Sequence, residues 1–291
     1  DLRDWRNFPL ADPGTAAAGT PLNWNTNFQN NPYWILETNR NTLEKDRLLG
    51  NIELSYQLND WLTLSSTVGV DSYSQLTTNR KAIGSNNAQN GSYGEAMRRY
   101  EEINASILLG FSKNITEDIG FSLNLGSNTM RRERNTTSGF LPGLQLPNLY
   151  TLTNLQTGAT ATTNSFDQNS KINSVYGFGQ LSYKDFLFVD FTGRNDWASV
   201  LQVNNNSFFY PSVAGSIVLS DALDLSAASV DFLKVRGGWS KVGGIGALTP
   251  YRINQTFGLI STGFGSQGFS PNSQSNPELK PEEKIGIEAG I

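Results

Sequence analysis

The residues best placed for covalent chemistry are two pairs of adjacent carboxylates, Glu101-Glu102 and Glu117-Asp118. A glycoside hydrolase needs an acid and a nucleophile or base held a fixed distance apart across one bond. Neighbouring residues of a strand point to opposite faces, so neither pair meets this need alone. The sequence also has no His and no Cys, the usual general base and thiolate. It therefore predicts no catalytic residue and a protein that is not an enzyme.

Signals for bound ions and cofactors are equally weak. Asp167 and Asn169 could offer oxygen atoms to Ca²⁺, but they lack the rest of a calcium-loop signature, so calcium binding stays open. The glycine pairs at 237–238 and 243–244 flank a strand pattern without the G-x-x-x-x-G-K phosphate motif. Such glycines ease strand curvature. We predict no metal site and no cofactor.

The charge balance and hydropathy narrow the class of protein further. The 291 residues include 22 basic and 26 acidic ones, and no block of five or more basic residues occurs, so nucleic-acid binding has no support. No run of about 18 apolar residues could form a transmembrane helix, and the first residues lack a signal-peptide pattern. A membrane location would therefore require a β-barrel. The chain begins at Asp1 without Met and stops inside an alternating segment, as expected for part of a longer protein.

Strict alternation of apolar and polar residues is the main structural signal. Between residues 50 and 71, Ile52 and Leu54 alternate with Asn51 and Glu53, and the pattern resumes after a two-residue turn at Asn59-Asp60. This pattern predicts a hairpin whose strands each have one apolar and one polar face. Further strands are predicted at about 103–111, 121–126, 175–183, 186–194, 210–220, 232–242 and 284–291. We expect an all-β, antiparallel fold with about nine strands.

The predicted connections alternate between short and long. Short turns near 59, 115 and 184 alternate with long polar loops near 72–97, 127–171, 195–208 and 243–282. Outer-membrane barrels combine short periplasmic turns with long extracellular loops, and their strands of about 9–11 residues face lipid on one side. Aromatic residues flank the short turns, as in an interfacial girdle: Tyr56, Trp61, Phe111, Tyr183 and Phe186. These features predict an antiparallel transmembrane β-barrel.

A soluble carbohydrate-binding β-domain, such as a β-sandwich, is the main structural alternative, because its strands also alternate. Against it, charged residues lie within the polar faces, as at Glu53, Glu102 and Arg236. The strand-plus-turn repeat is also longer than the roughly 8–12 residues typical of sandwiches. This alternative predicts a protein that stays monodisperse without detergent.

Five segments, taken in order, carry a more specific signal. They are NPYWILETNRNTLEKDRLLGNIELSYQLNDWLTL (31–64), YGFGQLSYKDFLFVDFTGRNDWASVL (176–201), FFYPSVAGSIVLSDAL (208–223), FLKVRGGWSKVG (232–243) and NPELKPEEKIGIEAGI (276–291). Together they resemble the barrel of SusC/RagA-type TonB-dependent transporters of Bacteroidetes, with its NPYW-like loop, YKD turn, R-x-D loop and NP-x-L-K-x-E segment. In that family the R-x-D loop continues with small, Ser-rich residues. This chain instead has Asp196-Trp197-Ala198-Ser199, which leaves the conformation of this loop open.

The resemblance implies that residues 1–291 are one partial barrel domain, without the plug domain and the last strands of a barrel of about 22 strands. It implies TonB-dependent import of oligosaccharides or peptides across the outer membrane, in contact with outer-membrane lipids. The implied partners are TonB, reached through a plug segment, and a SusD-like surface lipoprotein, with a dimer of transporter–lipoprotein pairs as one possible assembly. A passive porin-like barrel or an adhesin remains the alternative function.

Two sets of residues are candidates for contact with substrate or partners. Polar residues expected to line the lumen are Asn51, Glu53, Asn104, Ser122, Asn124, Lys234 and Arg236, although each could simply be solvated. Aromatic residues expected in loops could stack on a substrate or contact the lipoprotein. They are Trp34, Tyr73, Tyr93, Trp197 and Phe264. A loop aromatic more often packs against its own loop.

Overall fold

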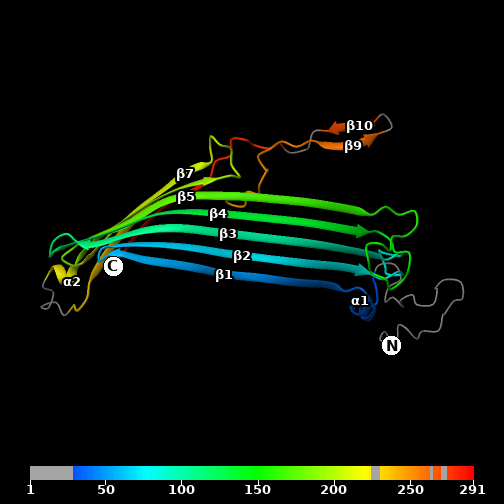
Figure 1. The fold of residues 1–291 in the computed structure, drawn as a ribbon, viewed down its shortest axis with the longest axis horizontal. Helices are drawn as coiled ribbons and strands as arrows, with labels where there is room; N and C mark the ends of the chain where they lie inside the picture. The colour runs from blue at the N-terminus through cyan, green and yellow to red at the C-terminus, as the bar shows by residue number, and fades with distance from the viewer. Residues whose placement is uncertain (1–28, 224–229, 263–264, 270–273) are drawn as a thin grey trace. The chain divides into compact units, whose positions relative to one another are not determined.

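The computed structural model describes residues 29–223, 230–262, 265–269 and 274–291, and most of them form one antiparallel sheet. Its nine strands lie in the order β1 (Asn41–Asn59), β2 (Leu62–Lys81), β3 (Ser92–Asn114), β4 (Ile119–Leu141), β5 (Thr162–Tyr183), β6 (Leu187–Ala198), β7 (Ser207–Val218), β8 (Lys234–Gly244) and β11 (Glu282–Gly290). Figure 1 shows β1 to β5 side by side in chain order. The predicted all-β, antiparallel class with nine strands is confirmed.

Three small elements accompany this sheet. A separate two-stranded ladder pairs β9 (Gly258–Thr262) with β10 (Gly265–Phe269), inside a segment expected to be loop. Two short helices, α1 (Pro32–Thr38) and α2 (Leu219–Ala222), complete the structure. Over the ranges that the structure describes, neither helix has the length and apolar character needed to span a membrane.

The first five strands are longer than predicted. They contain 19 to 23 residues each, so much of the loops expected at 72–97 and 127–171 is strand, and only 82–91 and 142–161 connect strands there. Apolar alternation marked only part of each strand. The remaining parts are joined by polar cross-strand pairs, such as Thr42 with Thr78 at 2.6 Å, which give no hydropathy signal.

The strand ends also differ from prediction in two places. The first turn lies at Asp60-Trp61 rather than Asn59-Asp60, because the side chain of Asn59 accepts a hydrogen bond from the backbone N–H of Trp61 (3.1 Å). The strand predicted to reach residue 220 ends at Val218 and passes into α2. The third short turn includes Lys184-Asp185, as predicted, and both residues have positive φ, 46° and 56°. It also includes Phe186, because Tyr183 pairs with Leu187 across the hairpin.

The chain divides into two compact units. The first unit comprises residues 1–48, 71–101 and 133–167, and the second comprises 49–70, 102–132 and 168–291. The loops at 82–91 and 142–161 belong to the first unit, and the short turns near 60, 116 and 185 belong to the second. The second unit also contains the longer connections that follow β6, β7 and β8.

Helix α1 anchors one loop of the first unit through Trp34. The Asn31 side chain caps the helix by accepting a hydrogen bond from the Tyr33 N–H (2.9 Å). Trp34 is buried against Ala82, and its indole N–H donates to the Ser85 hydroxyl (2.9 Å). The 82–91 loop is therefore fastened by this side chain.

Replacing Trp34 by Ala should release the 82–91 loop. The variant removes a buried side chain, a change that typically costs about 3–5 kcal/mol where the site cannot collapse. We expect faster tryptic cleavage near Lys81, measured by limited proteolysis of the full-length protein. Trp197→Ala is the control, since Trp197 is 40% exposed and lies in the second unit. Equal cleavage rates in both variants would contradict the anchoring role.

A second small core closes the 142–161 loop of the first unit. Tyr93, Leu141 and Leu144 are buried together, with Tyr150 packed against them. Burial raises the pKa of the Tyr150 phenol, while nearby Arg80 opposes this rise. This small core therefore holds together the ends of β3 and β4 that lie near the 142–161 loop.

The second unit exposes a broad apolar surface. A row of rings crosses it from Trp61 to Phe111 (5.3 Å between centroids), then to Phe121 (5.9 Å) and to Phe191 (6.5 Å). We call the sheet face of this unit that carries Phe111, Phe121 and Phe191 the apolar face, and the opposite one the polar face. Large side chains remain exposed on the apolar face, such as Val175 at 54%. Soluble monomers rarely expose so contiguous an apolar surface.

Candidate functional site: the polar face of the sheet

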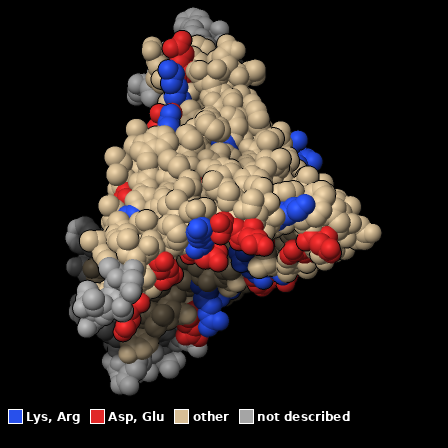
Figure 2. Space-filling model, turned by 90° about the vertical axis from the view of Figure 1, so that its left-hand side faces the viewer, with Lys and Arg blue, Asp and Glu red and all other residues tan. Residues whose placement is uncertain are grey.

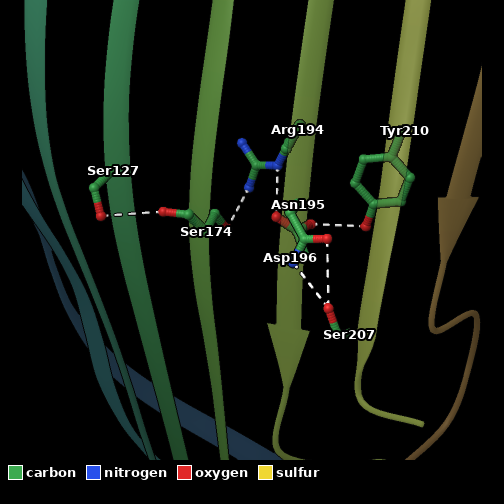
Figure 3. A network of polar contacts seen from close by, with 7 residues as sticks. All are labelled: Ser127, Ser174, Arg194, Asn195, Asp196, Ser207 and Tyr210. Carbon is green, nitrogen blue, oxygen red and sulfur yellow. Dashed lines mark hydrogen bonds and ion pairs between the residues drawn. The ribbon is translucent and has the colours of Figure 1, made fainter.

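The polar face of the second unit carries a network centred on Asp196, which is 9% exposed. Its carboxylate accepts hydrogen bonds from Arg194 Nε (2.7 Å) and from the Tyr210 hydroxyl (2.8 Å). The other end of the Arg194 guanidinium donates to the hydroxyl of buried Ser174 (2.8 Å). Figure 3 shows Arg194 between Ser174 of β5 and Asp196, with Tyr210 of β7 reaching the same carboxylate. The network therefore joins three strands.

The R-x-D motif explains how this network forms. Its two charged residues are two positions apart in β6, and this spacing places both on the same face of a strand. The segment predicted to be an R-x-D loop is therefore strand up to Ala198. Beyond it, Val200, Leu201 and Phe208 form a buried cluster. The sequence analysis missed Arg194, Asp196 and Tyr210, although the i, i+2 spacing was a usable signal.

Beside this network, the Tyr176 ring packs closely against Gly126. Arg194 lies over the Tyr176 ring, 5.4 Å from its centroid. A Cβ at Gly126 would lie 2.5 Å from this ring, so the glycine leaves the space that the ring fills. Arg194 therefore sits on an aromatic platform that glycine makes possible.

A hollow of about 300 Å³ lies further along the same unit. Ala214 and Gly238 are among its small lining residues, and register pairs them across β7 and β8. Its charged lining residues are Asp190, Lys234, Arg236 and Glu288. Figure 2 shows charged side chains of both signs close together along one band, while most of the visible surface is uncharged. The hollow offers both signs of charge around a small-residue floor.

A second charged contact holds β3 to β4. Arg132 donates to the Glu102 carboxylate through Nε (2.9 Å), and the Asn104 amide also donates to Glu102 (2.9 Å). Glu101, the neighbour of Glu102, points to the opposite side of the strand, as alternation predicts. The adjacent carboxylates thus do not form an acid–base pair. In the described ranges, no group of three or more His, Cys, Asp or Glu residues could hold a metal ion.

The predicted lumen residues lie on strands of the second unit. Asn104 belongs to the Glu102 contact, Lys234 and Arg236 line the hollow, and Asn124 lies across from Gly110. Asn51 lies across from Gly69. Glu53 follows Asn51 by two residues in β1, and Ser122 precedes Asn124 by two residues in β4, so each shares a strand face with that neighbour. Their role in a lumen stays a prediction.

The four predicted loop aromatics that the structure describes lie in strands or in a helix. Tyr73, Tyr93 and Trp197 lie in strands, because the strands extend beyond the apolar alternation, and Trp34 is buried in helix α1. Tyr93 is also buried, and its hydroxyl donates to Glu95. Phe264 lies outside the described residues. Of the possible calcium ligands, Asp167 accepts a hydrogen bond from the Asn135 amide (2.7 Å).

The first unit carries a tyrosine pair on one face of its strands. Tyr73 stacks on Tyr100 with 4.9 Å between centroids, and the Lys45 ammonium lies 3.8 Å from the centroid of the Tyr73 ring. Arg47 binds Asp71 through two hydrogen bonds of 2.7 Å. We call the sheet face of this unit that carries Lys45, Tyr73 and Tyr100 the tyrosine face.

Comparison with known proteins agrees with this geometry. A model of the family described as TonB dependent receptor-like, beta-barrel matches residues 2–291. The chain is 28% identical over 153 residues to the TonB-dependent receptor P26 of Formosa agariphila. The aligned region covers 48% of this chain and 15% of that protein.

Two solved structures share the fold. The RagAB peptide importer in the closed-closed state matches with a TM-score of 0.79 and 16% identity, over 89% of this chain and 29% of the other. The RagAB peptide transporter matches with a TM-score of 0.76 and 17% identity, over 90% and 30%. The chain therefore spans less than a third of the length of these relatives.

A sheet with one apolar, aromatic-banded face and one charged, hydrogen-bonded face is the wall of an outer-membrane β-barrel. This chain belongs to the TonB-dependent receptor-like β-barrel family. The predicted outer-membrane location and the resemblance to SusC/RagA-type transporters are confirmed at this level.

Proposed function

We propose that the full-length protein imports oligosaccharides or peptides across the outer membrane, driven by TonB and assisted by a SusD-like surface lipoprotein. The observation that carries this proposal is the two-faced wall of the second unit, and it is supported by the match of residues 2–291 to the TonB-dependent receptor-like β-barrel family. RagAB, whose fold this chain shares, is a peptide importer. The chemistry needed for import is binding and release, and it requires no catalytic residue in the wall.

In this proposal the polar face lines the lumen and the apolar face contacts lipid. The reason is energetic: a charged side chain on the lipid side costs about 2–4 kcal/mol at the bilayer midplane. Asp196, Arg194 and Glu102 all lie on the polar face, while the ring row from Trp61 to Phe191 lies on the other. The short turns are then periplasmic, and the loops of the first unit are extracellular.

Fractionation of cells that produce the full-length protein tests the proposal. We expect recovery in the outer membrane, copurification of a large lipoprotein in mild detergent, and loss of substrate uptake when TonB is deleted. Uptake that is unchanged without TonB would contradict active import.

A passive barrel is the second candidate, because the described strands could equally enclose an open pore. It predicts that the purified protein conducts ions in a planar bilayer without TonB. A closed, non-conducting protein favours import over this alternative.

A further inference from the structure

The two faces of the first unit differ sharply in charge. On its described strands, the tyrosine face carries five cationic side chains and one carboxylate: Lys45, Arg47, Lys81, Arg98, Arg134 and Asp71. The opposite face carries six carboxylates and two cations: Glu44, Asp46, Glu95, Glu101, Glu133, Asp167, Arg80 and Arg99. The whole chain has a net charge of −4, so composition does not explain a basic face.

Contacts within the unit fix which residues share each face. Arg98 lies two residues before Tyr100, which stacks on Tyr73. A Cβ at Gly94 would lie 3.2 Å from Phe140, so even-numbered positions of β3 and β4 share a face, and Arg134 is one of them. On the other face, the Ser74 hydroxyl contacts Met97, and Asn135 binds Asp167. The charge separation therefore follows from observed pairs.

Among the described residues, no ion pair neutralises part of the cationic charge on the tyrosine face. Arg47 is paired with Asp71, the single carboxylate of that face. Nε of Arg98 is buried and meets no hydrogen-bond acceptor among the described residues. A buried N–H donor without a partner is costly, and an anion that reorients the guanidinium would satisfy it. The face is thus suited to negatively charged groups.

Uncharged polar side chains lie between these cations. Strand alternation places Gln75, Thr77 and Asn79 on the tyrosine face of β2, with Thr136 and Ser138 on that of β4. The described apolar residues of this face are few: Leu43, Ala96, Phe140 and Phe166. Sugar hydroxyls both donate and accept hydrogen bonds and match such a surface, whereas the apolar side chains of a mixed peptide would find few apolar partners on it.

We propose that the tyrosine face binds an acidic oligosaccharide, bearing carboxylate or sulfate groups, on its way into the barrel. The inference rests on the proposed import function and names its substrate class. Bidentate contacts from arginine to the anionic groups supply specificity, and the clustered cations raise the local concentration of the substrate.

Binding to the full-length transporter, purified with its lipoprotein, tests this proposal by titration calorimetry. The probes are a galacturonate hexamer, its methyl ester, a sulfated galactose hexamer and hexaglutamate. We expect at least one acidic sugar to bind about tenfold or more tightly than the neutral ester, and the difference to shrink with added salt. Equal binding of acid and ester, or binding of hexaglutamate alone, would overturn the assignment.

Matched variants locate the site on the tyrosine face. Arg98→Gln and Arg134→Gln should each weaken binding of the acidic sugar about tenfold and leave the ester unaffected. Arg99→Gln is the control, because Arg99 adjoins Arg98 in β3 but faces the other way. Equal effects of Arg98→Gln and Arg99→Gln on the affinity for the acidic sugar would contradict the proposal. Import of neutral sugars without preference for acidic ones would also sink it, while leaving the proposed import function intact.

Discussion

Replacing Gly179 by Val should abolish most of the folded barrel. A Cβ at this position would collide with the backbone carbonyl oxygen of Ser122 and would lie 2.7 Å from Cζ of Phe191. The backbone of a paired strand cannot move aside, so we expect a loss at or above the upper end of the about 1–3 kcal/mol typical of overpacking. The measurement is the fraction of full-length protein in the outer membrane that keeps heat-modifiable gel mobility.

Gly215→Val provides the matched control for this substitution. Gly215 also lies in a strand, but the single neighbour of its Cβ position within 4 Å is the carbonyl oxygen of Phe188, at 3.9 Å. We expect near-normal folding of this variant, because Val also favours strands. If both variants fold equally well, the close packing at Gly179 does not matter for assembly.

Replacing Asp196 by Ala should destabilise the protein by about 1–3 kcal/mol, because it leaves Arg194 and the Tyr210 hydroxyl without their shared acceptor. The full effect of a lost buried pair is not expected, since Arg194 is 41% exposed and water can reach it. Denaturant unfolding of the full-length protein in detergent would measure the loss. Asp118→Asn, which alters an exposed pair with Lys184, should change nothing measurable.

A double-mutant cycle tests whether Asp196 acts through Tyr210. Tyr210→Phe removes only the hydroxyl, so its effect should largely vanish once Asp196 is Ala. A coupling free energy of about 0.5 kcal/mol or more is expected for residues in direct contact. Additive effects of the two substitutions would show that the hydrogen bond between them contributes little.

Local sequence patterns were enough to predict the class of fold. Period-two alternation in segments such as 50–58 is a local property, since side chains of a strand must point to opposite faces wherever the strand lies. The short turn that begins at Lys184 was predictable because the alternating segments on either side of it lie so close together in sequence. The ordered motifs added the resemblance to a family.

Which polar residues meet depends on how the strands pair, and this could not be read from the sequence. Arg194 and Asp196 are close in sequence, but Tyr210 and Ser174 reach them from other strands, and pairing register is set by the whole ladder. The true strand lengths were hidden for a related reason. Beyond the apolar segments both faces are polar, so hydropathy loses its period, while backbone hydrogen bonds continue the strand regardless of side chain. The opposite charges of the two faces around Tyr73 and Tyr100 could therefore be seen only after the strands were paired.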